Sequence, residues 1–204
     1  MISIEDLAAL KTACLSCTNC ELAATRTQVV FSRGNPHNRV IVVGEAPGAE
    51  EDKSGRPFTG ASGQLLDKMF LSVGLSPNFD LYITNTVRCR PPGNRVPSEQ
   101  ETESCRFWLE DEITLIDPKF IVAVGATSLK WFTKKPIKIT QERGKWFNWQ
   151  HPSGVLYKVI PIFHPSFLLR QGANWDDPNS VYNKTFNDLK AIARALKEGE
   201  FENA

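Results

Sequence analysis

The residues whose spacing most clearly indicates chemistry are the cysteines. Cys14, Cys17 and Cys20 form two overlapping C-x2-C units, and Cys89 and Cys105 lie far downstream. Three thiols at this spacing in a polar stretch match a hydrophobic core poorly, whereas they are typical ligands of zinc or of an iron–sulfur cluster. The pattern therefore predicts a metal or cluster site, with a set of unrelated buried thiols as the alternative.

A glycine- and proline-rich stretch with several carboxylates follows an apolar run. It reads GEAPGAEED over residues 44–52, and GRPF follows at 55–58. Glycine lets the backbone approach a ligand closely, and the amides of such a turn can hold an anion or a water molecule. No Gly-Lys-Ser/Thr follows, so this is not a phosphate-binding P-loop. The alternative for Glu50, Glu51 and Asp52 is a solvated turn.

Two further polar side chains follow apolar runs directly. Asn85 comes after the run 81–84, and its amide offers both a donor and an acceptor, which suits a pyrimidine edge. His164 comes after the run 159–163. A lone histidine is more often structural than catalytic, but a position at a strand end puts it at the same edge as Asn85. We therefore expect one site at this edge.

The elements that must position these residues alternate between strands and helices. Apolar runs predict strands at 39–43, 81–84 and 120–124 and a hairpin of 145–149 with 156–160, and helical spacing predicts helices at 4–13, 62–73, 98–116, 126–132 and 181–197. Ser98, with Glu101 three residues later, resembles a capping box. The alternation predicts an α/β sandwich around a mainly parallel sheet.

The chain is expected to form one domain over residues 1–204, because no internal repeat or low-complexity tract interrupts it. In parallel sheets, ligands bind beyond the carboxyl ends of the strands. Four loops are expected there, at 44–60, 85–97, 125–127 and 163–171. Three of these loops contain the polar stretches described above.

The composition is typical of a soluble globular protein, with 41% hydrophobic and 23% charged residues. The apolar runs have strand length, far below the roughly 20 residues that span a bilayer. The amino terminus lacks the basic start and apolar stretch of a signal peptide, so we expect a cytoplasmic protein. An odd number of cysteines in such a chain does not favour a disulfide framework.

The net charge of +1 does not by itself indicate a nucleic-acid partner. Any affinity for DNA must come from local clustering. Arg88, Arg90 and Arg95 crowd one short loop and are the candidates for such a cluster. The alternative is an ordinary solvated loop.

The combination of these stretches resembles one family. GEAPGAEED with GRPF, ITN followed by CRPPGNR, and HPSFLLR, in this order and at these separations, are similar to the family 4 uracil-DNA glycosylases, iron–sulfur enzymes of bacteria and archaea. The resemblance extends from about Cys17 to the last predicted helix. It implies a three-layer α/β/α sandwich around a mainly parallel, four-stranded central sheet. It also implies a monofunctional enzyme that flips uracil out of DNA and hydrolyses its N-glycosidic bond, initiating base excision repair.

The resemblance assigns the cysteines. It implies a 4Fe–4S cluster on Cys17, Cys20, Cys89 and Cys105, because the sequence after Cys20 continues as it does in the family. Cys14 is then left over as a free thiol. Four thiolates alone suit iron–sulfur or zinc equally, and it is the resemblance that favours iron. A structural role is expected, since the reaction transfers no electrons.

The resemblance also implies a substrate pocket, made of Glu45, Ala46, Gly48, Phe58, Asn85 and His164. Phe58 is expected to stack on the flipped base and Asn85 to read its polar edge. His164 is expected to donate a hydrogen bond to the uracil oxygen where negative charge develops. Ala46 stands where the wider superfamily often has a water-positioning carboxylate. We therefore expect the neighbouring Glu45 in the catalytic set, together with His164 and Asn85, and Glu51 or Asn94 as helpers.

Residues implied to meet DNA are Arg90, Ser166, Leu168, Leu169 and Arg170. The leucines would form an apolar wedge and Arg170 would contact phosphate, with core packing as the alternative for one leucine. The expected partner is uracil-containing DNA, single or double stranded, with no membrane, and we expect a monomer. A related branch that traps itself covalently on DNA has a histidine-containing loop. Residues 90–97 contain no histidine, so ordinary turnover is expected.

Two other functions are compatible with parts of the sequence. A non-catalytic, zinc-stabilised nucleic-acid-binding module would explain the cysteines and arginines but not Phe58, Asn85 and His164 at one sheet edge. An enzyme of the same fold acting on thymine mismatches or deaminated purines would keep that edge. The pocket implied by Phe58 and Asn85 favours uracil.

Overall fold

A computed structural model describes residues 4–38, 40–135, 137–172 and 174–199. The described residues form one six-stranded sheet with the strand order β1-β3-β2-β4-β6-β5. The strands are β1 (Arg33–Gly34), β2 (Val40–Gly44), β3 (Tyr82–Asn85), β4 (Phe120–Val124), β5 (Phe147–Gln150) and β6 (Leu156–Ile162). The four central strands run parallel, whereas β1 and β5 pair antiparallel at the two edges.

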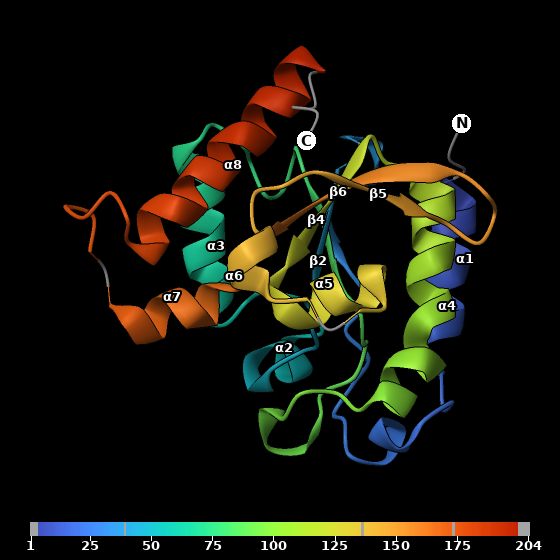
Figure 1. The fold of residues 1–204 in the computed structure, drawn as a ribbon. Coiled ribbons are helices and arrows are strands. Elements are labelled where there is room, and N and C mark those ends of the chain that lie inside the picture. The colour runs from blue at the N-terminus through green and yellow to red at the C-terminus, as the bar shows by residue number, and fades with distance from the viewer. Residues whose placement is uncertain (1–3, 39, 136, 173, 200–204) are drawn as a thin grey trace.

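Helices cover both faces of the sheet (Figure 1). They are α1 (Ile4–Leu15), α2 (Ala49–Ser54), α3 (Ala61–Ser72), α4 (Glu99–Ile116), α5 (Gly125–Thr133), α6 (Ile139–Glu142), α7 (Pro165–Gln171) and α8 (Val181–Glu198), with short 3-10 turns η1 (Glu21–Ala24), η2 (Pro36–Asn38) and η3 (Pro92–Asn94). Helices α1 and α4 lie side by side on one face, and α3 and α8 lie on the other. The architecture is therefore the expected three-layer α/β/α sandwich.

The alternation of side chains along the buried strands separates two cores. Val40 and Val42 of β2 pack with α3, α7 and α8, and Ile41 and Val43 pack with α4 and α5. All five residues of β2 are buried. A strand that is apolar on both faces is typical of a parallel sheet with helices on each side.

The structure confirms the central parallel sheet, but the expected count of four strands is wrong for the sheet as a whole. The sheet gains β5, which was predicted only as part of a hairpin, and β1, whose two residues are too short to leave an alternating pattern. The strand predicted from Arg39 begins at Val40 in the structure, and Arg39 lies outside the described residues.

The capping box is confirmed at the start of α4, where the Ser98 hydroxyl accepts the Glu101 amide and the Glu101 carboxylate accepts the Ser98 amide. Three short helices were not predicted: α2 and α7 lie in expected loops, and α6 precedes the hairpin. Proline at the first position of α7 fits a helix start, because its missing N–H would have no partner there in any case.

Candidate active site

All six residues predicted for the substrate pocket line one cavity of about 500 Å³ at the carboxyl ends of the parallel strands. They come from the ends of β2, β3 and β6 and from the loop after α2. Glu45 follows β2, Asn85 ends β3 and His164 follows β6. The strand order reverses around β2, which is where open α/β sheets form a crevice for ligands.

Gly44, the last residue of β2, makes room for two of the pocket side chains. A Cβ at this position would lie 2.4 Å from Asn85 Oδ1 and 2.5 Å from Phe58 Cζ. Phe58 itself is buried at a φ of 55°, which is rare for a bulky side chain and costs conformational energy. Its ring centroid lies 6.1 Å from that of His164. The surrounding loop thus holds the aromatic ring in a position that the residue alone would not favour.

Glu51 fixes the loop that carries Phe58. Its Oε2 accepts the Gly48 amide at 3.0 Å, and its Oε1 accepts the amides of Thr59 at 3.0 Å and Gly60 at 2.8 Å. One carboxylate therefore satisfies three backbone donors on either side of α2. These bonds occupy Glu51 and make it a loop-fixing residue, so the expectation that it helps to activate water loses its support.

The neighbouring carboxylates differ from one another. Asp52 is buried and accepts the Thr27 amide at 2.9 Å, which ties α2 to the amino-terminal segment. Glu50 is exposed and pairs with Lys53 at 3.3 Å. The solvated-turn alternative therefore applies to Glu50 alone.

Asn85 is 2% exposed, yet no hydrogen bond joins its side-chain amide to another described residue. A buried amide usually has a partner, because leaving its donor and acceptor unmade is costly. The amide borders the cavity, where a ligand with matching polar groups would satisfy it.

His164 has a defined tautomer. The Ser166 backbone N–H donates to its Nδ1 at 3.2 Å, and the Ser166 hydroxyl lies 2.8 Å from the same atom. Burial, aided by the nearby Arg170 charge, lowers the pKa of His164 to about 4. The ring is therefore neutral at pH 7 with Nδ1 as the acceptor, so its proton is on Nε2.

Glu45 is held at both its backbone and its side chain. Its carbonyl oxygen accepts the Thr86 hydroxyl at 2.6 Å and the Val87 amide at 3.0 Å. The Thr127 hydroxyl, from the first turn of α5, donates to Oε2 of the Glu45 carboxylate. Glu45 is thus a pocket carboxylate with a fixed orientation.

The residues predicted to meet DNA are only partly where they were expected. Leu168 is fully buried in the core formed with α3 and α8, because α7 turns this side chain inward. Its predicted place at the DNA surface is therefore wrong, and the core-packing alternative is confirmed for this leucine. Leu169 is 45% exposed and Arg170 is exposed beside the cavity. Asn94, named as a possible helper for water, accepts a hydrogen bond from Arg90 Nε at 2.7 Å.

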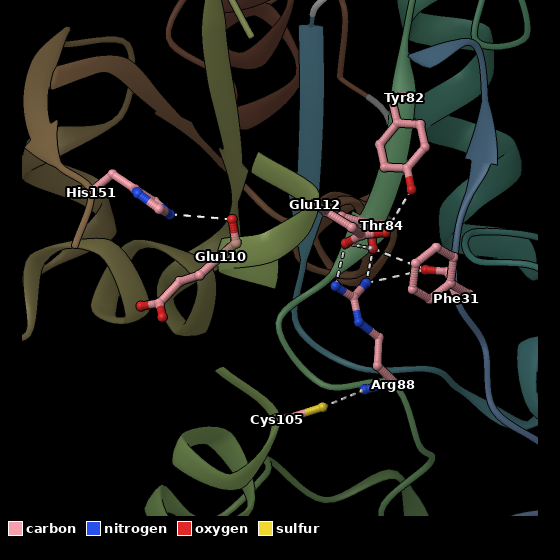
Figure 2. A network of polar contacts seen from close by, with 8 residues as sticks. All are labelled: Phe31, Tyr82, Thr84, Arg88, Cys105, Glu110, Glu112 and His151. Carbon is pink, nitrogen blue, oxygen red and sulfur yellow. Dashed lines mark hydrogen bonds and ion pairs between the residues drawn. The ribbon is translucent and has the colours of Figure 1, made fainter. Parts of the chain in front are cut away.

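Two of the three arginines that were expected to form a DNA-binding cluster pair with carboxylates of the protein instead. Arg95 forms two hydrogen bonds to Glu101, and Arg88 is buried and paired with Glu112. Figure 2 shows the Arg88 guanidinium directed at Glu112, Thr84 and the backbone oxygen of Phe31. Arg88 is therefore no phosphate contact, and the prediction of a three-arginine DNA patch is corrected.

The cysteines gather in a small core of their own with Trp108. Cys14, Cys89 and Cys105 are buried in it, and Cys17 and Cys20 pack against it. Among the described residues, no group of three or more histidine, cysteine, aspartate or glutamate side chains is arranged to hold a metal ion. Burial raises the pKa of both the Cys14 and Cys105 thiols, so burial does not distinguish them.

Hydrogen bonds to sulfur distinguish Cys17, Cys89 and Cys105 from Cys14 and Cys20. Trp108 Nε1 donates to Cys17 Sγ at 3.4 Å, Arg26 Nη1 to Cys89 Sγ at 3.3 Å, and the Arg88 amide to Cys105 Sγ at 3.3 Å. Such donors stabilise thiolates and tune iron–sulfur clusters. Three of the four cysteines predicted as ligands thus have a donor suited to a bound thiolate.

Several supporting residues were missed by the sequence argument, namely Gly44, Glu51 as a loop-fixing residue, Thr127, Glu112, Arg26 and Trp108. Glu112 left a weak signal, because it is a carboxylate on the apolar face of an otherwise amphipathic helix. Thr127 left none, since its partner is 82 residues away.

No helix in the described part of the chain is long and apolar enough to cross a membrane.

Comparison with known proteins identifies the family of this chain. The family model described as the Uracil DNA glycosylase superfamily matches residues 31–192, which include every pocket residue. The type-4 uracil-DNA glycosylase of Thermotoga maritima is 46% identical over 159 residues, 78% of this chain and 80% of the relative. Those of Sulfurisphaera tokodaii and Archaeoglobus fulgidus are 39% and 38% identical over 93% and 83% of this chain, and each is covered to 86%. The chain belongs to the type-4 uracil-DNA glycosylases.

Proposed function

We propose that this chain excises uracil from DNA by hydrolysing the N-glycosyl bond, as an enzyme of DNA repair. The observation that carries the proposal is the cavity that brings Phe58, Asn85 and His164 together at one sheet edge, in a chain of the type-4 family. A uracil inside a duplex is inaccessible, so it must be flipped into this cavity before it can be cut.

The pocket recognises the base through its polar edge and its face. The buried Asn85 amide, which has no hydrogen bond to another described residue, would pair with the donor and acceptor of the uracil edge. The strained Phe58 presents an apolar ring for stacking. A site whose buried polar groups are satisfied only by the right base discriminates strongly against others.

The chemical step would use His164 and Glu45. Water adds at C1′ of the sugar while the C1′–N1 bond breaks, and the electron pair of that bond leaves with the uracil. His164, neutral with its proton on Nε2, donates a hydrogen bond to the uracil oxygen that takes up this charge. The Glu45 carboxylate orients the attacking water and accepts its proton.

Replacement of His164 tests the leaving-group role. His164→Ala should slow single-turnover excision roughly 10²–10³-fold with DNA binding nearly unchanged, because the donor acts mainly in the transition state. The measurement uses enzyme excess over a uracil-containing oligonucleotide, so that product release does not limit the rate. A variant that cuts at close to the wild-type rate would show that His164 is structural.

We also propose that Cys17, Cys20, Cys89 and Cys105 hold a 4Fe–4S cluster. Their shared core and the N–H donors to three of the four sulfurs fit such a group. When bound, it would cross-link the amino-terminal segment, the loop after β3 and α4. Uracil hydrolysis transfers no electrons, so this role is structural.

Metal analysis and visible absorbance of purified variants test the cluster. Replacing any of the four proposed ligands by serine should remove iron, whereas Cys14→Ser, a matched change in the same core, should keep it. Stoichiometric zinc in a colourless protein would contradict the cluster. Iron lost on replacing Cys14 would mean that the ligand register is wrong.

The range of substrates follows from the same pocket. Excision should be fastest for uracil, in single- or double-stranded oligonucleotides, and much slower for hypoxanthine or for thymine in a duplex mismatch. A strand-incision assay with these substrates measures it directly. We keep the prediction of a monomer, which the mass in solution tests.

A further inference from the structure

The first turn of α5, which was predicted as a loop, has no role in the reaction as described so far. Residues 125–127 lie at the carboxyl end of β4, between the strands that carry Glu45 and His164. Gly125 has a φ of 88°, and a Cβ there would lie 2.9 Å from His164 Cβ. Two residues later, Thr127 donates its hydroxyl proton to Glu45. The first turn of α5 therefore lies against both residues of the proposed chemical step.

The Glu45 contact is specific. Among the described residues, Thr127 is the only hydrogen-bond donor to the Glu45 carboxylate, and it reaches one oxygen, Oε2. The backbone of Glu45 is already fixed through Thr86 and Val87. The side-chain torsions of Glu45 are then the remaining freedom, and the Thr127 hydroxyl removes it.

The other carboxylates of the loop are used elsewhere. Glu51 bonds three amides, Asp52 bonds the amino-terminal segment, and Glu50 is exposed beside Lys53. Glu50 also borders the cavity, but its side chain is 64% exposed to solvent. Glu45 is the half-buried loop carboxylate that lines the cavity and keeps one oxygen, Oε1, unengaged by the described residues. Its orientation decides whether that oxygen can meet a water molecule.

We infer that Thr127 is a positioning residue for uracil excision, whose hydroxyl orients the Glu45 carboxylate toward the attacking water. The inference rests on the proposed role of Glu45. A flexible glutamate would spend much of its time in unproductive rotamers, and a misplacement of about 1 Å at a reacting group costs on the order of 100-fold in rate. Thr127 acts through Glu45 and needs no contact with the substrate.

Substitution at Thr127 tests this by single-turnover excision under enzyme excess. Thr127→Val removes the hydroxyl but keeps the shape, and it should slow excision by roughly 10- to 100-fold, the range of a hydrogen bond to a charged group. Thr127→Ser keeps the hydroxyl and should stay within roughly threefold of the wild type. DNA affinity and thermal unfolding should be unchanged in both variants.

A matched control lies on the same helix. Thr133 donates its hydroxyl proton to the Leu129 carbonyl at 2.9 Å, at the far end of α5 from the cavity. Thr133→Val makes the same chemical change without touching Glu45, so its excision rate should equal that of the wild type. An equal slowing in the Thr127 and Thr133 variants would assign the effect to the helix and overturn the inference.

A double-mutant cycle separates this inference from the proposed role of Glu45. In a Glu45→Ala background, Thr127→Val should slow excision by less than roughly twofold, because its partner is gone. If Thr127→Val slows the Glu45→Ala enzyme as much as it slows the wild type, the inference is overturned. It is also overturned if Glu45→Ala is slow while Thr127→Val alone cuts at the wild-type rate. If Glu45→Ala itself cuts at the wild-type rate, it is the proposed role of Glu45 that fails.

Discussion

Strand β3 places polar side chains in two environments, a closed hydrogen-bond network and the edge of a cavity. On one side, Thr84 and Tyr82 join Glu112 and Arg88 in a network that is almost completely buried, with side-chain exposures of 1% for Arg88 and 0% for Glu112 (Figure 2). At the carboxyl end, Asn85 borders an open cavity. Both oxygens of the Glu112 carboxylate accept hydrogen bonds, whereas the Asn85 side-chain amide has no hydrogen-bond partner among the described residues.

The difference indicates that some side chains of β3 stabilise the fold while another serves the substrate pocket. In the buried network, burial acts to lower the pKa of Arg88, but the Glu112 carboxylate together with the nearby Cys105, Cys14 and Tyr82 outweighs it, and the pKa is raised. Arg88 also donates its amide to Cys105, so this network joins β3, α4 and the cysteine core. In the pocket, the Asn85 amide and one oxygen of Glu45 have no hydrogen-bond partner among the described residues. We expect damage to the first to lower stability and damage to the second to lower activity.

The largest effect is expected from breaking the buried ion pair. Glu112→Ala leaves a buried, unpaired Arg88, which should lower the free energy of unfolding by about 3–5 kcal/mol. Tyr82→Phe removes one hydrogen bond of 2.6 Å to the same carboxylate and should cost only about 1–2 kcal/mol. Urea unfolding measures both. A Glu112→Ala protein as stable as Tyr82→Phe would contradict a critical role for the pair.

The next effect is expected in the pocket at Gly44. A methyl group there would displace Asn85 and Phe58, so Gly44→Ala should slow single-turnover excision by about 100-fold. Adding Asn85→Ala to Gly44→Ala should then cost less than it does in the wild type, because the amide is already displaced. Full additivity of the two changes would mean that Gly44 does not shape the pocket.

A smaller effect concerns pH and His164. Because the pKa of His164 is lowered from 6.5 to about 4 on folding, the unfolded chain binds a proton at a higher pH than the folded protein. The stability tied to this residue is fully present above pH 6.5 and is lost progressively as the pH falls toward 4. Between pH 7 and pH 5, the free energy of unfolding of the wild type should fall by on the order of 1–2 kcal/mol more than that of His164→Asn.

Urea unfolding of both proteins at pH 7 and pH 5 and constant ionic strength measures this difference, and effects of other titrating groups cancel in the comparison. The difference between wild type and variant should change with pH in the stated direction. A pH-independent difference would place the folded pKa of His164 near its ordinary value.

The smallest effect is expected at the edge of the cavity, on the salt dependence of DNA binding. Arg170 is exposed beside the cavity, so Arg170→Ala should reduce the slope of log affinity against log salt by about one without changing the preferred base. Lys11→Ala on α1 offers a control on an exposed cation outside the pocket. An unchanged slope for Arg170→Ala would place this arginine away from DNA.

Much of the fold could be predicted from local patterns. The β-branched runs of β2 and β4 and the capping box at Ser98 each depend on neighbouring residues, and the structure confirms them. The two-residue β1 and the short helices α2 and α7 depend on contacts with distant segments. The Asp52 bond to Thr27 is an example that no periodicity reveals.

The site divides in the same way. Asn85 and His164 could be found because they directly follow predicted strands, and the resemblance added Phe58. The burial of Arg88 could not be found, because an arginine beside prolines looks exposed in sequence. For the two leucines, the sequence allowed that one of them packs in the core but did not show that it is Leu168. Thr127 meets Glu45 only through the sheet order, which brings β2 beside β4.

The most direct test of this separation compares two adjacent residues. Thr84→Val should lower the free energy of unfolding by about 1–3 kcal/mol and leave the single-turnover rate within a few-fold of the wild type, because its hydroxyl serves Phe31, Glu112 and Arg88. Asn85→Ala should slow excision by at least roughly 100-fold and change stability by less than about 1 kcal/mol. Measuring unfolding and excision on the same preparations of both variants decides the matter. If each variant loses both stability and excision rate, then Thr84 and Asn85 do not have separate structural and catalytic roles.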